Sequence, residues 1–139
     1  MVDKEKNDRL SDMNMFWMAK DPKKETPFGR SGIFESYDSL DLYYAGIGGN
    51  TNSTTRFRKY QADGYKPILK EYKDSAHLLT KNKMYHITII TKANDTSLWV
   101  NDECYFVGSF EAPLTSGYFA FRSTWSRQAI KNFRVYQLL

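Results

Sequence analysis

Short apolar and aromatic runs, separated by turn-forming residues, recur along most of this chain. Alternating apolar and polar residues predict half-buried strands, and a short continuous apolar run predicts a buried one. We expect about eight strands, at residues 12–19, 41–47, 54–60, 85–91, 97–100, 103–107, 118–122 and 130–136. The run at 12–19 is also compatible with a helix, because short apolar runs do not distinguish the two.

Two long connections interrupt these strands. Residues 20–40 contain prolines, glycines and charges, and loops of that length in a compact domain are usually functional or mobile. Residues 61–83 form a second irregular connection, in which 75–79 is expected to make a short helical turn. With no long helix and frequent turn signals, the pattern predicts an all-β sandwich or barrel.

The stretch 43–60 carries the strongest functional signal. A glycine-asparagine corner at 46–52 joins an aromatic strand to a strand of alternating long polar and apolar residues. The two-residue strand period places Arg56, Arg58 and Tyr60 on one face, the two arginines about 7 Å apart. Guanidinium groups suit carboxylates, so this face is a candidate site for an acidic ligand. The alternative is that the arginines pair with acids of the chain itself, such as Asp41 or Glu71.

Size and composition favour one β-rich domain. The chain has 139 residues, of which 16% are aromatic, and aromatic side chains suit pleated, half-buried surfaces. The net charge is +4, with Lys and Arg spread along the chain. Nucleic-acid binding is therefore not expected, because its footprint is a concentrated basic stripe.

Few residues are available for metal or disulfide chemistry. Cys104 is the single cysteine, and His77 and His86 are the two histidines, so no disulfide scaffold, zinc site or cofactor is expected. We find no acidic loop suited to calcium. No apolar run approaches the roughly 20 residues of a membrane span, and the N-terminus has no apolar signal-peptide region.

The meander from 85 to 107 resembles the strand–hairpin–strand unit of concanavalin-A-like, or laminin-G-like, jelly rolls. Ile87, Ile89 and the run 98–103 carry this resemblance, and 117–124 and 130–136 fit the same fold. It implies a jelly-roll sandwich of two antiparallel sheets.

A more specific resemblance is to an uncharacterised bacterial family, DUF6250. It is carried by segments at 8–14, 16–19, 30–32, 43–44, 48–50, 54–60, 78–79, 121–122 and 132–136. This family is common in Bacteroidota and is related to the YesU-like domains of pectin-degradation operons. The resemblance implies a carbohydrate-binding or carbohydrate-processing domain of polysaccharide utilisation, in the periplasm or secreted, with a saccharide partner.

Jelly rolls of this kind run to roughly 200 residues. The segment at residues 8 and 9 already aligns with the middle of a family member, so we expect a jelly roll truncated at its N-terminus. On this interpretation residues 1–10 are a disordered or remnant segment and 11–139 form one domain.

The candidate carbohydrate-binding residues combine hydrogen-bonding amides and arginines with aromatic rings that could stack on sugars. They are Asn14, Tyr43, Tyr44, Asn50, Asn52, Arg56, Arg58, Tyr60, Arg122, Trp125 and Arg127. The alternatives are core packing for the aromatic residues and turn chemistry for Asn50 and Asn52. Arg122 is expected on the same open surface as Arg56, because it lies opposite the face of Phe119 and Phe121.

Catalysis is a separate question. An ordinary glycosidase needs two carboxylates facing one bond, and no strand here shows an alternating Glu-x-Asp pair. A polysaccharide lyase needs a group that neutralises a uronate and a proton-transferring residue, for which Tyr44, Tyr60 and His77 are weak candidates. A non-catalytic structural or interaction module is a further alternative.

Overall fold

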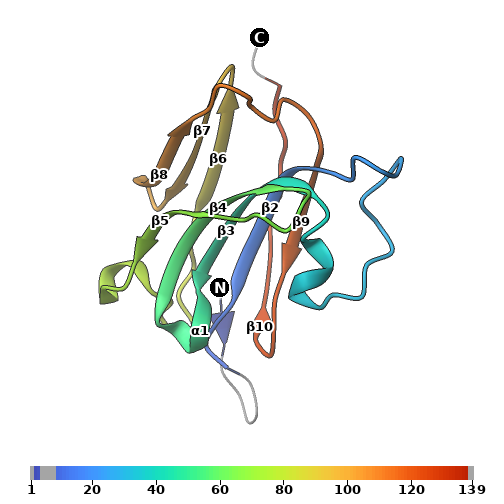
Figure 1. Cartoon of the computed structure of the whole chain (residues 1–139). Helices are drawn as coiled ribbons and strands as arrows, with labels where there is room; N and C mark the ends of the chain where they lie inside the picture. Colours follow the sequence, from blue (N-terminus) through green and yellow to red (C-terminus); the bar gives the residue numbers. More distant parts are fainter. Residues whose placement is uncertain (1, 4–8, 138–139) are drawn as a thin grey trace.

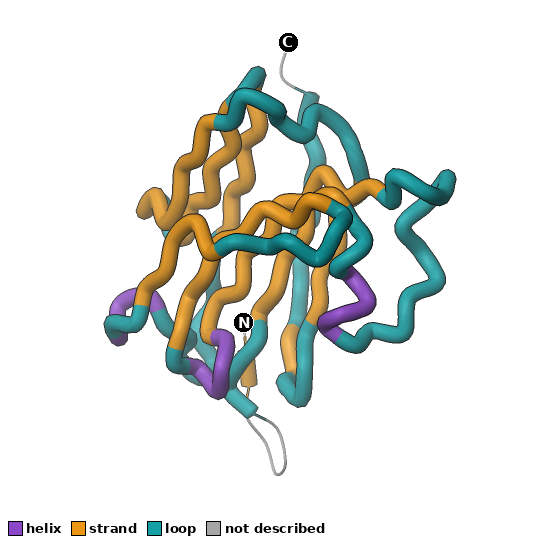
Figure 2. The backbone as a smooth tube through the Cα atoms, in the orientation of Figure 1, coloured by secondary structure: helices purple, strands orange, loops and turns teal. Residues whose placement is uncertain are grey.

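The computed structural model describes residues 2–3 and 9–137. Its elements in chain order are β1 (Val2–Asp3), β2 (Met13–Lys20), η1 (Phe34–Tyr37), β3 (Asp41–Gly48), α1 (Gly49–Asn52), β4 (Thr54–Gln61), β5 (Ile68–Tyr72), η2 (Ser75–His77), β6 (Ile87–Lys92), β7 (Asp95–Val100), β8 (Glu103–Ser109), β9 (Tyr118–Arg122) and β10 (Arg127–Gln128). Strands dominate, and the helical segments are single turns between them (Figure 2).

Two antiparallel sheets form the body of the molecule. The larger has five strands in the order β5-β4-β3-β2-β9, and the smaller has three in the order β6-β7-β8. Strands β1 and β10 pair separately. Figure 1 shows β6, β7 and β8 grouped beside the larger sheet. The predicted all-β class with two antiparallel sheets is confirmed.

The main hydrophobic core lies between the two sheets. Phe57 of β4 stacks on Phe106 of β8 with ring centroids 3.6 Å apart. Trp17 of β2 is 3% exposed, and its indole N–H donates to Thr96 Oγ1 of β7 at 2.9 Å. These contacts bind the sheets face to face, and the face of the larger sheet that they cover is called the inner face below.

A second apolar cluster covers the opposite, outer face of the larger sheet. It consists of Phe16, Ala19, Leu40, Leu42, Tyr44 and Tyr60, with Phe34 and Tyr37 of η1 packed against them. The long connection between β2 and β3 therefore lies over part of this face. Phe34 and Tyr37 of this connection cover the outer face where the second sheet covers the inner face.

Individual segments match the sequence predictions to different degrees. Residues 13–20 form a strand, so the helical alternative for this run is wrong. The connection 61–83, expected to be irregular, contains the edge strand β5 as well as the helical turn η2. Residues 1 and 4–8 lie outside the described residues, and so does most of the expected disorder at 1–10, whereas Val2–Asp3 pair with β10.

The strand expected at 130–136 is not formed. This segment joins no sheet among the described residues, and its side chains are exposed. Phe133, 55% exposed, contacts only the rings of Phe119 and Phe121 among the described aromatic residues. Alternation alone does not make a strand, because the backbone also needs a neighbouring ladder to bond.

Candidate functional site

A row of polar side chains crosses the outer face of the larger sheet. In the strand register Arg122 lies opposite Asn14, Asn14 opposite Gly46, Gly46 opposite Arg56, and Arg56 opposite Glu71. Residues directly opposite one another share a face, so all five lie on one side of the sheet. Three strand spacings separate the Cα atoms of Arg122 and Arg56, which is about 14 Å. This polar row is the candidate binding surface.

Arg56 and Arg58 both have partners within the chain. Arg56 Nε lies 2.6 Å from Glu71 Oε1, so the expected pairing with Glu71 is confirmed for this arginine. Hydrogen bonds from Arg56 and Lys73 lower the pKa of Glu71. Arg58 Nη1 donates to the carbonyl of Lys66 at 2.6 Å. Each of these contacts uses one of the five N–H donors of a guanidinium, so donors remain for a ligand.

Arg122 is fixed at the other end of the polar row. Its Nε donates to the carbonyl of Gly32 at 3.1 Å, and its guanidinium lies 5.3 Å from the ring centroid of Phe34 and 6.0 Å from that of Tyr37. The contacts with the connection between β2 and β3 hold Arg122 beside the outer face. Arg122 therefore lies on the same sheet face as Arg56, as predicted.

Asn14 and Tyr44 are buried beneath this surface. The Tyr44 hydroxyl donates to Asn14 Oδ1 at 3.0 Å, and both residues are at most 7% exposed. A Cβ added at Gly46 would lie 2.1 Å from Tyr44 Oη, so the glycine gives the tyrosine side chain its space. Burial raises the pKa of Tyr44, and Asp12 adds to the increase. These two residues support the surface more than they present groups to solvent.

Tyr43 and Tyr60 do not expose their rings to solvent, as stacking on a sugar would require. Tyr43 points to the inner face, is 1% exposed, and accepts a hydrogen bond from the backbone N–H of Leu114. Tyr60 is fully buried on the outer side, and its hydroxyl has no hydrogen-bond partner among the described residues. Burial raises the pKa of both phenols. Both rings therefore pack in the core, which was the alternative to stacking on a sugar.

The corner between β3 and β4 is a left-handed turn. Asn50, Thr51 and Asn52 have φ values of 51°, 59° and 58°, which asparagine tolerates better than most residues. Asn52 exchanges two hydrogen bonds with the backbone of Leu79, at 2.8 and 2.9 Å. Asn50 is exposed and makes a long contact of 3.5 Å with Thr54. Asn52 therefore stabilises the turn, whereas Asn50 is accessible to solvent.

The remaining candidates do not belong to the polar row. Trp125, 75% exposed, is in the turn between β9 and β10, and Arg127 belongs to β10. His77 stacks on Tyr72 with centroids 3.8 Å apart, and its ring nitrogens lie 2.7 Å from Asp74 and 3.3 Å from Glu103. The structure does not bring His77 together with Arg56 and Arg58.

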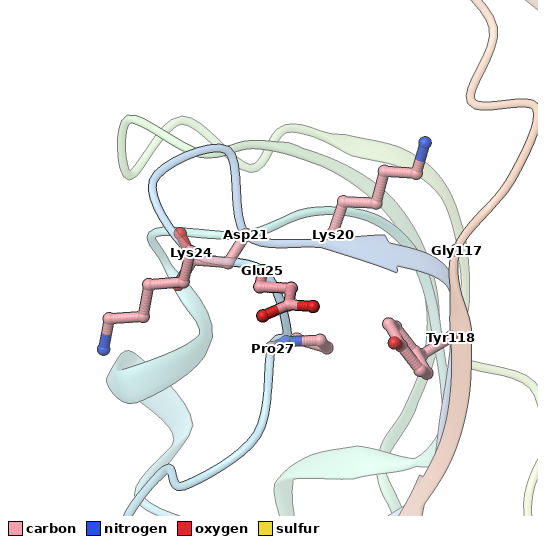
Figure 3. A pocket seen from close by; sticks show the side chains of 7 residues that line it. All are labelled: Lys20, Asp21, Lys24, Glu25, Pro27, Gly117 and Tyr118. Atoms are coloured by element: carbon pink, nitrogen blue, oxygen red, sulfur yellow. The ribbon is translucent and has the colours of Figure 1, made fainter.

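One hollow was not anticipated from the sequence. A cavity of about 320 Å³ lies at the start of β9, between the first residues of the β2–β3 connection and Tyr118 (Figure 3). Its other lining residues are Lys20, Asp21, Lys24, Glu25, Pro27 and Gly117. The length of the connection was the available signal, because long ordered loops often carry function.

Comparison with known families identifies the chain. The family model DUF6250, described as a domain of unknown function, matches residues 1–133. The chain belongs to the DUF6250 family. This confirms the family resemblance, whereas the YesU relationship and the bacterial group remain predictions.

A search of curated proteins found no match. Among solved structures, the carbohydrate-binding module CBM66 from Bacillus subtilis matches with a TM-score of 0.47 and 10% identity. The match covers 86% of this chain and 59% of that one. A structural similarity at this TM-score and identity does not indicate which ligand the DUF6250 chain binds.

Two kinds of feature are absent from the part of the chain that the structure describes. It contains no helix long and apolar enough to cross a membrane. Nor does it contain a group of three or more His, Cys, Asp or Glu side chains placed to hold a metal ion.

Proposed function

We propose that this chain is a carbohydrate-binding domain whose outer sheet face takes an acidic saccharide. The observation that carries the proposal is the polar row, in which Arg122 and Arg56 flank Asn14 and Gly46 across neighbouring strands. Arg58 lies on the same face in the next row, opposite Tyr44. Three guanidiniums on one sheet face favour a ligand with carboxylates.

The length of the row suits an extended chain more than a single sugar. About 14 Å separates its two end arginines at the Cα level. The side chain of Arg56 is 28% exposed, and that of its partner Glu71 is 25% exposed. An incoming uronate carboxylate can compete with Glu71 for Arg56, because ion pairs that solvent reaches contribute little net free energy. We place this role in polysaccharide utilisation, in the periplasm or outside the cell.

Binding is favoured over catalysis by the state of the tyrosines. A proton-abstracting group works best when its pKa lies near the working pH. Burial raises the pKa of Tyr44 and of Tyr60 well above the ordinary phenol value, so both remain protonated. His77, the third weak catalytic candidate, belongs to a separate cluster with Tyr72 and Asp74. We therefore propose a binding role without a lyase or hydrolase step.

A panel of immobilised polysaccharides tests the proposal. We expect retention on polygalacturonan or alginate, and weaker retention on neutral glucans and galactans. The ultraviolet absorbance of an unsaturated uronate should not increase with any retained polymer, whereas an increase would indicate a lyase. No retention on any acidic polymer would contradict the proposal and favour an interaction module.

A further inference from the structure

The cavity at the start of β9 has a carboxylate and an aromatic ring directed toward the same space. Figure 3 shows the Glu25 carboxylate pointing into the hollow, the Tyr118 ring on the opposite wall, and the Pro27 ring between them. The amino groups of Lys20 and Lys24 point away from the centre. Among the described residues, none forms a hydrogen bond or an ion pair with the Glu25 carboxylate. Its carboxylate is therefore free to accept hydrogen bonds from a ligand.

The wall that carries Glu25 is held in place by a buried ion pair. Asp21, whose side chain is 4% exposed, lies 2.6 Å from Arg30 Nη2. Arg30 also donates to the carbonyl of Pro27 at 3.0 Å, and Asp21 accepts from the backbone N–H of Lys23 at 2.9 Å. The loop from 21 to 30 is thereby tied at both ends. A cavity formed in advance loses less conformational entropy when a ligand binds.

The opposite wall is also supported. The Phe28 and Tyr118 rings form a T-shaped pair, with centroids 4.8 Å apart and an interplanar angle of 66°. Tyr118 remains 43% exposed. A Cβ at Gly117 would lie 2.3 Å from the backbone of Met18, so glycine permits the close approach of β9 to β2 at this point. Tyr118 is therefore held at the rim with part of its ring available.

We propose that this cavity binds one uncharged pyranose ring of a glycan, at a site separate from the polar row. A sugar ring presents apolar C–H groups that can pack on Tyr118 and hydroxyl groups that can donate to Glu25. Its volume of about 320 Å³ is at the small end of ligand cavities, as a single ring requires. The inward carboxylate repels a uronate, so the sugar taken here is neutral. The inference rests on the proposed function in assigning a glycan as ligand.

Titration of the full chain with methyl glucoside, methyl galactoside and methyl mannoside, followed by NMR chemical shifts, tests this site. We expect at least one of them to bind at millimolar concentration and to shift the amide signals of residues 24–27 and 117–118. Tyr118→Ala and Glu25→Gln should each weaken that binding at least about tenfold, as expected for lost packing or a lost charged hydrogen bond.

Tyr65→Ala provides the matched control, because Tyr65 is a similarly exposed tyrosine, at 60%, that does not line the cavity. It should leave binding of the methyl glycosides unchanged. The inference is overturned if no neutral glycoside binds the folded chain, or if binding survives Tyr118→Ala and Glu25→Gln. Equal losses in the Tyr65 control would overturn it too. Binding to acidic polymers that persists in the Tyr118 and Glu25 variants would leave the proposed function intact, so the two failures are distinguishable.

Discussion

Two buried tyrosines on the outer face differ in one hydrogen bond. Tyr44 donates to buried Asn14, whereas the Tyr60 hydroxyl has no partner among the described residues. An unsatisfied buried polar group costs about 1–3 kcal/mol, and a satisfied one contributes net stability. The same substitution should therefore have different effects at the two positions.

We predict that Tyr44→Phe lowers the free energy of unfolding by about 1–3 kcal/mol, because it leaves Asn14 Oδ1 buried without its donor. Tyr60→Phe should be neutral or slightly stabilising, because it removes an unpaired hydroxyl. Urea denaturation of both variants measures the difference. Equal destabilisation by the two substitutions would show that the hydroxyl of Tyr60 has a partner in solution.

At the scale of elements, a side-chain hydrogen bond between β2 and β7 helps to link the two sheets through the core. Trp17 of β2 donates to Thr96 of β7, and Thr96 is 1% exposed. Trp17→Phe should cost about 2–4 kcal/mol, through lost ring volume together with the lost bond. Thr96→Val removes the same acceptor with little change in shape. In a double-mutant cycle by urea denaturation we expect the costs to be less than additive, and strict additivity would contradict an inter-sheet bond.

Strands with a clear alternation could be predicted from the sequence, and those whose pairing depends on neighbours could not. The meander from β6 to β8 follows from its pattern and its hairpin turn. Strand β5 is an exposed edge strand after Pro67, and its composition gives no clear period. The segment 130–136 has a strand-like pattern but no ladder beside it among the described residues.

Part of the candidate site could likewise be predicted from the sequence, and part could not. The period of β4 was enough to place Arg56 and Arg58 on one face. The sequence indicated Glu71 and Asp41 as possible partners of the β4 arginines. The choice between them depends on the register of β5. The alignment of Arg122 with Asn14 likewise comes from strand pairing across more than 100 residues of sequence. The cavity at Tyr118 depends on how the β2–β3 connection folds, which carries no periodic signal.

At the scale of the whole molecule, ion pairs near the β5 edge make stability depend on pH. Hydrogen bonding to Arg56 lowers the pKa of Glu71, and hydrogen bonding to His77 lowers that of Asp74. Their ordinary values are 4.5 and 3.8. A depressed carboxyl pKa stabilises the fold above the unfolded-state value, and this contribution is lost as pH falls through the folded-state value.

We therefore predict that the free energy of unfolding decreases as the solution is acidified from about pH 5 to about pH 3. The double variant Glu71→Gln with Asp74→Asn should be less stable at neutral pH and should show a shallower acid decrease. Urea denaturation across this range measures both slopes. Identical slopes for the variant and the wild type would mean that other carboxyl groups cause the decrease.

The central claim is that the outer face of the larger sheet recognises a carboxylated glycan through Arg56, Arg58 and Arg122. Its most direct test is calorimetric titration of an oligogalacturonate or oligoalginate into the wild type, Arg56→Ala with Arg58→Ala, and Arg134→Ala. Arg134 is exposed and lies in the segment after β10, outside the polar row, so it serves as a single-arginine control. We predict that the double variant loses affinity by at least about tenfold while the control keeps it. Unchanged affinity in a folded double variant would contradict the account.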